Sequence, residues 1–73
     1  MTKILTAILE REGDGFVALC PELDIASQGK SLEEAKVNLR EAVELFFECA
    51  DEKETANRLS GEIYVTQIEV ELA

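Results

Sequence analysis

The sequence predicts an α+β domain in which three strands precede one helix and a fourth strand follows it. Three observations predict this order: two apolar runs joined by a polar turn with glycines, a stretch with helical spacing of apolar residues, and a final stretch of alternating apolar and polar residues. A chain of 73 residues buries only about 60% of its unfolded surface and cannot divide its core. Residues 1–73 are therefore expected to form a single domain.

The first two predicted strands form a β-hairpin. Residues 3–12 are apolar on both faces near their middle, which is typical of a strand inside a sheet. The turn at residues 12–15 contains two glycines that can adopt positive φ, and the apolar run of residues 16–20 follows at once. Pro21 has no N–H and ends this strand, so residues 25–28 are expected to form a short third strand.

The helix is predicted for residues 32–50. Ser31 can accept a hydrogen bond from the first turn, while Glu34 is expected to accept one from the backbone N–H of Ser31, as in a capping box. Val37 and Leu45 lie outside the apolar stripe. The stripe itself is expected to pack on the sheet and consists of Leu32, Ala35, Leu39, Ala42, Val43, Phe46 and Ala50.

Residues 51–61 are predicted to form a polar connector with a turn of helix near residues 56–59, and residues 62–72 alternate like a half-buried strand. Three antiparallel strands followed by a helix return the last strand parallel to the first. The prediction is a mixed four-stranded sheet of order 3-2-1-4 with the helix on one face. The second face and two strand edges then remain uncovered, so we expect a homo-oligomer, a dimer or larger.

The charge of the chain indicates the class of its partner. Seven Lys and Arg residues stand against 16 Asp and Glu residues, a net charge of −9, and the cations are scattered along the sequence. Direct binding of nucleic acid is not expected, because it depends on clustered cations. A basic protein is the expected partner, since opposite charges accelerate association.

The cysteines and the apolar runs argue against a metal-binding protein and against a membrane protein. Cys20 and Cys49 are expected to be buried free thiols in a reducing compartment, with a disulfide as the alternative. Without any histidine, zinc would lack most of its usual ligands, so no metal or cofactor is expected. The apolar run at residues 4–9 is too short to span a bilayer. We therefore expect a cytoplasmic protein that does not contact the membrane.

Residues 8–48, ILEREGDGFVALCPELDIASQGKSLEEAKVNLREAVELFFE, resemble the HicB family of antitoxins. The resemblance rests on the order of features: an acidic strand end, a turn with glycine, an aromatic residue, the Cys-Pro-Glu-Leu step at residues 20–23, Gln28-Gly29, and a capped helix. It implies a partial ribonuclease-H-like fold. It also implies that the chain binds and occludes a small basic HicA-like toxin, an mRNA-cleaving ribonuclease, as the antitoxin of a type II toxin-antitoxin system.

Many HicB proteins continue into a DNA-binding domain, whereas this chain ends at Ala73. We therefore expect a short form of the family that does not bind operator DNA directly. The alternative is an orphan HicB-like oligomer with a structural or regulatory role and no toxin partner.

Two groups of residues are candidates for binding the partner. The acidic turn after Pro21 offers Glu22, Leu23 and Asp24, with a solvated connector as the alternative interpretation. On the helix, Glu44 accompanies the off-stripe residues Val37 and Leu45.

Enzymatic activity is not expected, and no catalytic residue is assigned. A two-metal nuclease needs carboxylates that converge from the middle of a central strand. The only acids of the first predicted strand, Glu10 and Glu12, lie near its end, and residues 6–8 at its middle carry no carboxylate.

Overall fold

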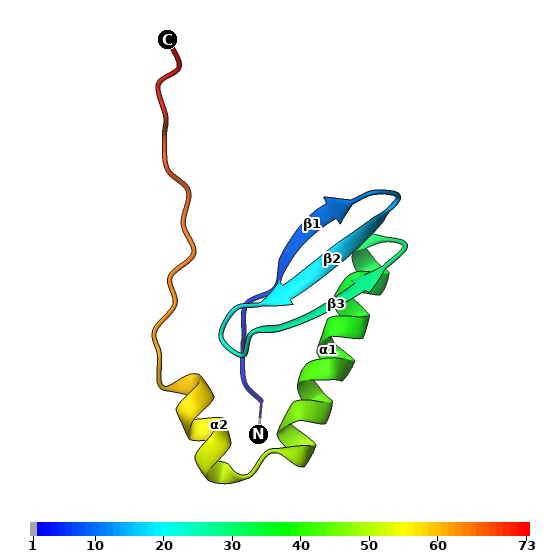
Figure 1. The fold of residues 1–73 in the computed structure, drawn as a ribbon, viewed down its shortest axis with the longest axis vertical. Helices are drawn as coiled ribbons and strands as arrows, with labels where there is room; N and C mark the ends of the chain where they lie inside the picture. Colours follow the sequence, from blue (N-terminus) through cyan, green and yellow to red (C-terminus); the bar gives the residue numbers. More distant parts are fainter. Residues whose placement is uncertain (1) are drawn as a thin grey trace.

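The structure, a computed structural model, describes residues 2–73 and contains three strands and two helices (Figure 1). The strands form one antiparallel sheet in the order β1-β2-β3. The predicted α+β class and the strand-strand-strand-helix order are confirmed. The elements are β1 (Ile8–Glu12), β2 (Gly15–Cys20), β3 (Ile25–Gly29), α1 (Leu32–Cys49) and α2 (Glu52–Leu59).

The hairpin of β1 and β2 has the predicted turn. Pairing runs from Ile8 opposite Leu19 to Glu12 opposite Gly15, which leaves a two-residue connection. Its first residue, Gly13, has a φ of 59°, and glycine adopts positive φ without steric cost. The turn therefore sets the register of the sheet.

β1 begins at Ile8, later than the start predicted at residue 3. Because Ile8 pairs with Leu19 and β2 ends at Cys20, residues 2–6 lie past the end of β2. Pro21 cannot continue the ladder, since it lacks an N–H. We call residues 2–7 the N-terminal segment.

α1 covers one face of the sheet, mainly over β3 and β2, and contacts β1 far less. Its start confirms the predicted cap: Ser31 Oγ accepts a hydrogen bond from Glu34 N at 3.0 Å. The reciprocal bond differs by one residue from the prediction. Glu34 Oε1 accepts from the backbone N–H of Lys30 at 3.0 Å, because the carboxylate reaches the residue before the cap.

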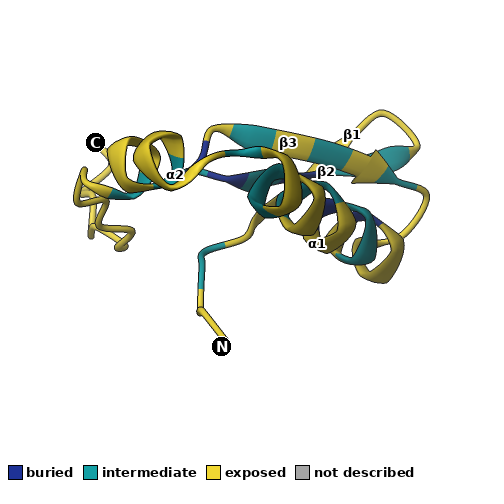
Figure 2. Cartoon of the chain, turned by 90° about the horizontal axis from the view of Figure 1, so that it is seen from below, coloured by how far each residue is buried: buried dark blue, intermediate teal, exposed yellow. Residues whose placement is uncertain are grey.

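The core between sheet and helix is small. Figure 2 shows the few buried positions on β2, the turn after it and α1, among intermediate and exposed positions. The buried residues of the described chain are Ala18, Cys20, Leu23, Ala35 and Leu39. A domain with so little buried apolar surface gains much from additional cover.

The predicted polar connector forms a complete second helix, α2. Asp51 Oδ1 accepts a hydrogen bond from Glu54 N at 2.7 Å at its start, and Leu59 at its end packs against the core. A turn of helix was expected only near residues 56–59. Most of the connector is helical because Asp51 provides an N-cap.

The fourth strand predicted for residues 62–72 is absent, since the sheet within residues 2–73 has three strands. The partial order 3-2-1 is confirmed, and the placement of strand 4 beside β1 is wrong for this chain taken alone. α2 redirects the chain, so that residues 62–73 run outward in an extended conformation, away from the sheet (Figure 1). We call residues 62–73 the arm.

Candidate functional site

The carboxylate of Glu22 ties the N-terminal segment to the turn after β2. Glu22 Oε2 accepts hydrogen bonds from Thr6 N at 3.0 Å and from Thr6 Oγ1 at 2.7 Å, and Oε1 lies 3.2 Å from Thr6 N. The Cys20 thiol donates to Oε1 at 3.6 Å. These bonds hold the N-terminal segment beside the end of β2, where the strand ladder no longer does.

The hydrogen bonds among Glu22, Thr6 and Cys20, which we call the Glu22 tie, accompany shifted pKa values of the Glu22 carboxyl and the Cys20 thiol. Partial burial by itself would raise the pKa of Glu22, but the hydrogen bonds from Thr6 outweigh that effect and hold the pKa below its usual value. Burial, together with the nearby charge of Glu22, raises the pKa of the Cys20 thiol. The tie therefore contains an ionised carboxylate and a protonated thiol at neutral pH.

Contacts from α2 hold the turn between β2 and β3 in place. The side chain of Leu23 is fully buried, and its carbonyl oxygen accepts a hydrogen bond from Arg58 Nη1 at 2.6 Å. The same guanidinium lies 5.5 Å from the centroid of the Phe46 ring on α1. Asp24 is exposed at the tip, with a φ of 55° that Asp tolerates better than most residues.

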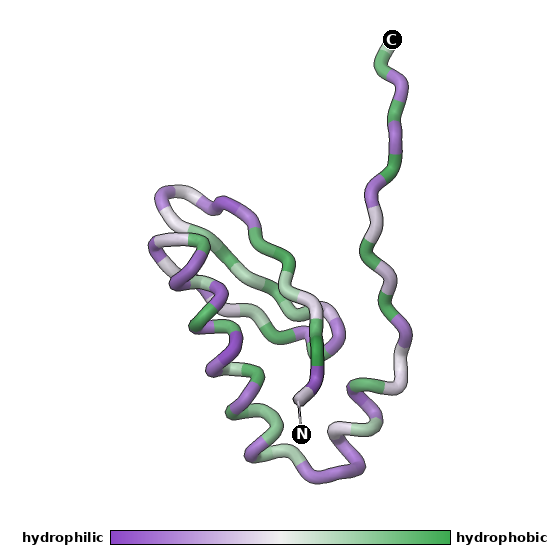
Figure 3. Tube along the Cα trace, turned by 180° about the vertical axis from the view of Figure 1, so that it is seen from behind, coloured by the Kyte–Doolittle hydropathy of each residue, from purple (hydrophilic) through white to green (hydrophobic). Residues whose placement is uncertain are grey.

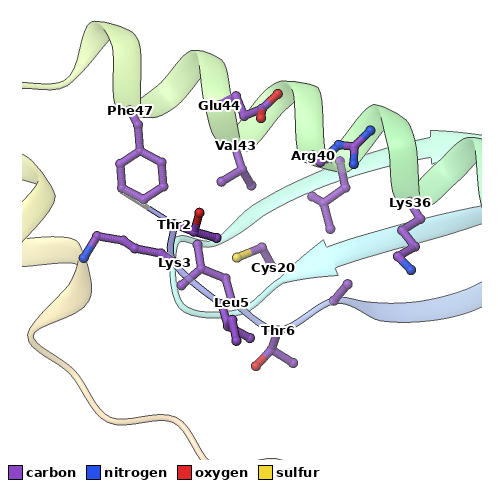
Figure 4. A pocket seen from close by; sticks show the side chains of 13 residues that line it. Thr2, Lys3, Leu5, Thr6, Cys20, Lys36, Arg40, Val43, Glu44 and Phe47 are labelled. Atoms are coloured by element: carbon purple, nitrogen blue, oxygen red, sulfur yellow. The ribbon is translucent and has the colours of Figure 1, made fainter.

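A groove of about 650 Å³ runs between the N-terminal segment, the end of β2 and one side of α1. Figure 4 shows Val43 and Phe47 pointing from α1 toward Leu5 on the opposite wall. The charged residues along the groove are Lys3, Lys36, Arg40 and Glu44. The groove is therefore apolar with a predominantly cationic rim, in a chain whose net charge is −9.

The described residues do not assemble a metal site. Within residues 2–73, no group of three His, Cys, Asp or Glu side chains is placed to hold a metal ion. The acids Glu10 and Glu12 stand on exposed positions of β1. In that same part of the chain, no helix is both long and apolar enough to cross a membrane.

Comparison with known proteins identifies the family. A UPF0150 protein from Helicobacter pylori is 34% identical to this chain over 71 residues, which cover 96% of this chain and 99% of that protein. The chain belongs to the UPF0150 family. No family model matches the sequence, and no solved structure gives a significant match.

In this UPF0150 protein the three residues predicted at the acidic turn have three different environments. Asp24 is exposed, as a binding residue would be. Leu23 is fully buried, and its side chain fills the core and offers no exposed surface to a partner. Glu22 is half-buried, and its carboxylate is already hydrogen-bonded to Thr6.

The three residues predicted on the helix also differ. Leu45 has 59% of its surface exposed, and Glu44 is exposed at the groove. Val37 is half-buried. Leu45 and Glu44 are thus the residues of this group with side chains free to meet a partner.

Sequence reasoning on the UPF0150 chain missed the convergence of cations around the groove. Lys3 lies far from Lys36 and Arg40 in the sequence, so the three count as scattered until the fold brings them together. The spacing of Lys36 and Arg40, four residues apart on a helix, was the available signal. The roles of Thr6 and Arg58 had no sequence signal, because both depend on contacts across the fold.

The two cysteines are free, as predicted, but their environments differ. Cys20 is buried, whereas Cys49 is exposed, so the predicted burial of Cys49 is wrong. Cys49 is the last residue of α1 and lies beyond the part of the helix that covers the sheet core.

Proposed function

We propose that this UPF0150 protein is a HicB-like antitoxin of a type II toxin-antitoxin system, which binds and occludes a small basic HicA-like mRNA-cleaving toxin. One observation carries the proposal: membership of the UPF0150 family, which is HicB-like, together with the HicB-like order of features in residues 8–48.

The charge of the molecule supports a basic partner. With a net charge of −9 and a pI of about 4.3, the protein attracts a cationic RNA-cleaving protein over distances of about 8–10 Å at moderate salt. Carboxylates on its surface would occupy the cations with which the toxin holds RNA phosphates. Occlusion then needs no chemistry from the antitoxin.

The residues assigned to toxin contact are Asp24 at the exposed turn and Glu44 and Leu45 on α1, each of which is exposed. Leu45 supplies an apolar contact, and the two acids supply charge. Glu22 contributes indirectly, because its bonds to Thr6 hold the turn and the N-terminal segment together.

The partial ribonuclease-H-like fold of HicB proteins includes a fourth strand beside the first. This chain does not place such a strand on its own sheet within residues 2–73. The proposal of that fold therefore requires the strand to come from another source.

The function is tested by calorimetric titration with the product of the small basic reading frame adjacent to the gene, at low and at high salt. We expect tight binding that weakens with salt, and arrest of RNA cleavage by the toxin at a stoichiometric amount of this protein. No binding at either salt would contradict the proposal and favour the orphan oligomer.

The assigned surface is tested by Asp24→Asn, which removes one charge and keeps a side chain that tolerates positive φ. We expect the dissociation constant for the toxin to rise about two- to fivefold at low salt, since rim charges contribute about 0.5–1 kcal/mol each. The control Asp14→Asn removes the same charge at the other end of the hairpin and leaves the affinity unchanged. Equal effects of both variants would show that only net charge matters.

A further inference from the structure

The arm exposes an apolar face that nothing in the same chain covers. Figure 3 shows hydrophobic and hydrophilic positions alternating along it. Tyr64 has 80% of its surface exposed, Ile68 82%, and Leu72 90%. Within residues 2–73 the arm belongs to no strand ladder, so its backbone N–H and C=O groups also lack strand partners. Such a segment is a strand without a sheet.

The end of α2 holds the start of the arm in place. Arg58 bonds to the carbonyl of Leu23 and lies over Phe46, and Leu59 packs on the core, so the last turn of α2 is fixed. The arm leaves from this fixed point and runs outward (Figure 1). The radius of gyration is consequently 14.4 Å. A compact chain of this length would have about 11 Å.

Among the described residues, β1 provides a free edge whose unpaired backbone N–H and C=O groups could pair with those of the arm. Glu12 and Gly15 close a two-residue hairpin and are therefore a hydrogen-bonded pair, so alternate residues of β1 direct their backbone groups toward β2. Leu9 and Arg11 lie between these residues, so their backbone N–H and C=O groups point to the free edge of β1. Thr6 N points to Glu22, so Ala7 in the N-terminal segment also directs its N–H to the free edge.

A strand added at this edge would cover the groove. Leu9 shares the helix-facing side of the sheet with its partner Ala18, and α1 leaves that side of β1 largely uncovered. The apolar face of the arm would lie there against Leu39, Val43 and Phe47. This face consists of Tyr64, Thr66, Ile68, Val70 and Leu72.

The net charges of arm and groove are opposite. The arm carries Glu62, Glu69 and Glu71 and no Lys or Arg. Glu62 shares the face that would meet the groove, whereas Glu69 and Glu71 lie on the outward face, so their attraction to the groove cations acts over a longer distance. The groove is lined by Lys3, Lys36 and Arg40, against the single acid Glu44. In a chain of net charge −9, an acidic segment is best accommodated at this cationic groove, which favours the arm as its occupant.

From these observations we infer that two copies of this chain exchange arms: the arm of each copy adds as a strand to the free edge of β1 in the other copy and fills its groove. Each sheet then gains a fourth strand beside β1 from the partner copy. The exchange satisfies the backbone of the arm and removes one open edge from each sheet. The exchange does not involve the toxin. If the protein forms this dimer but binds no toxin, the proposed function fails and the exchange of arms still holds.

The first test is the mass of the full-length protein in solution, by light scattering after size-exclusion chromatography. We expect a dimer. Ile68→Lys places a charge on the inward face of the arm and should weaken the dimer about a hundredfold or more, because the dimer contains this contact twice. The matched control Gln67→Lys changes the adjacent, outward-facing residue and should leave the mass unchanged. A wild-type monomer would overturn the inference.

The second test separates exchange from pairing of the two arms with each other. Ala7→Pro removes an N–H at the free edge, which no ladder within one copy uses, so the variant should fold but become monomeric. Mixing it with Ile68→Lys should restore a dimer, because the first variant has an intact arm and the second an intact edge. If Ala7→Pro remains a dimer of wild-type affinity, or if the mixture stays monomeric while each variant is folded by circular dichroism, the inference is wrong.

Discussion

At the scale of single residues, Glu22 shows how far local composition can mislead about a role. In the sequence it is one acid of an exposed-looking acidic turn. In the structure its carboxylate accepts hydrogen bonds from Thr6, sixteen positions away, and from the buried Cys20. A carboxylate that is already hydrogen-bonded stabilises the fold and has little capacity left for a partner.

Glu22→Gln should lower the free energy of unfolding by about 1–2 kcal/mol at pH 7, because a charged acceptor is replaced by a neutral one. The pKa of Glu22 is lowered in the folded protein, so its contribution is present above the usual pKa of 4.5 and is lost as the pH falls through the folded-state pKa. Urea unfolding measured from pH 7 to pH 3 checks both points. The variant should lose less stability than the wild type on acidification, and the control Glu10→Gln, at an exposed position, should leave the free energy of unfolding at pH 7 nearly unchanged. Identical pH profiles for wild type and Glu22→Gln would contradict this role.

At the scale of elements, the junction between β3 and α1 depends on close backbone contact. A Cβ atom on Gly29 would lie 2.5 Å from Ala35 N and 2.8 Å from the carbonyl carbon of Glu34. Both are backbone atoms of the first turns of α1, so neither can move without shifting the helix. Gly29 therefore allows the capped helix to turn back onto the sheet at once.

Gly29→Ala should destabilise the protein by about 2–3 kcal/mol, because the added methyl group forces β3 and α1 apart. Thermal unfolding by circular dichroism measures the effect. Gly61→Ala is the matched control: a Cβ there meets nothing within 4 Å, and its effect should stay within about 0.5 kcal/mol. A Gly29→Ala variant as stable as the control would show that the junction is more tolerant than its geometry indicates.

At the scale of the whole molecule, one copy is an incomplete structure. Its core is small, its sheet has free edges, and six large apolar side chains of the arm are exposed: Ile63, Tyr64, Val65, Ile68, Val70 and Leu72. Monomeric proteins rarely expose an apolar segment of this kind. The arm, the free edge of β1 and the cationic groove become complementary parts when a second copy is present.

If the copies exchange arms, the melting temperature should rise with protein concentration, because dissociation accompanies unfolding. A tenfold increase should raise it by about 3–6 °C for a dimer of this size. Calorimetry over a hundredfold range of concentration measures this slope. Ala7→Pro should show a lower melting temperature with no slope, and a wild-type protein without a slope would contradict association coupled to stability.

The parts of the fold that were predicted correctly depend on neighbours in the sequence. Gly13 at the hairpin, Pro21 at the end of β2 and Ser31 at the start of α1 each act within a few residues, so local patterns reveal them. The predicted partner-binding residues differ in exposure. Asp24, Glu44 and Leu45 are exposed, whereas Leu23 is buried, and its burial depends on packing that no short pattern contains.

The sequence by itself determined the α+β class, the hairpin, the capped helix, the acidic surface and the strand-like alternation of the arm. Only the tertiary structure decided that Glu22 links the turn after β2 to the N-terminal segment and that cations scattered in the sequence line one groove. The same holds for α2, which directs the arm outward. The physical reason is the range of the interactions. Turns and caps use contacts within one turn of chain, but the direction of the arm follows from Arg58 meeting Leu23 and Phe46, residues that are distant in sequence and adjacent only after folding.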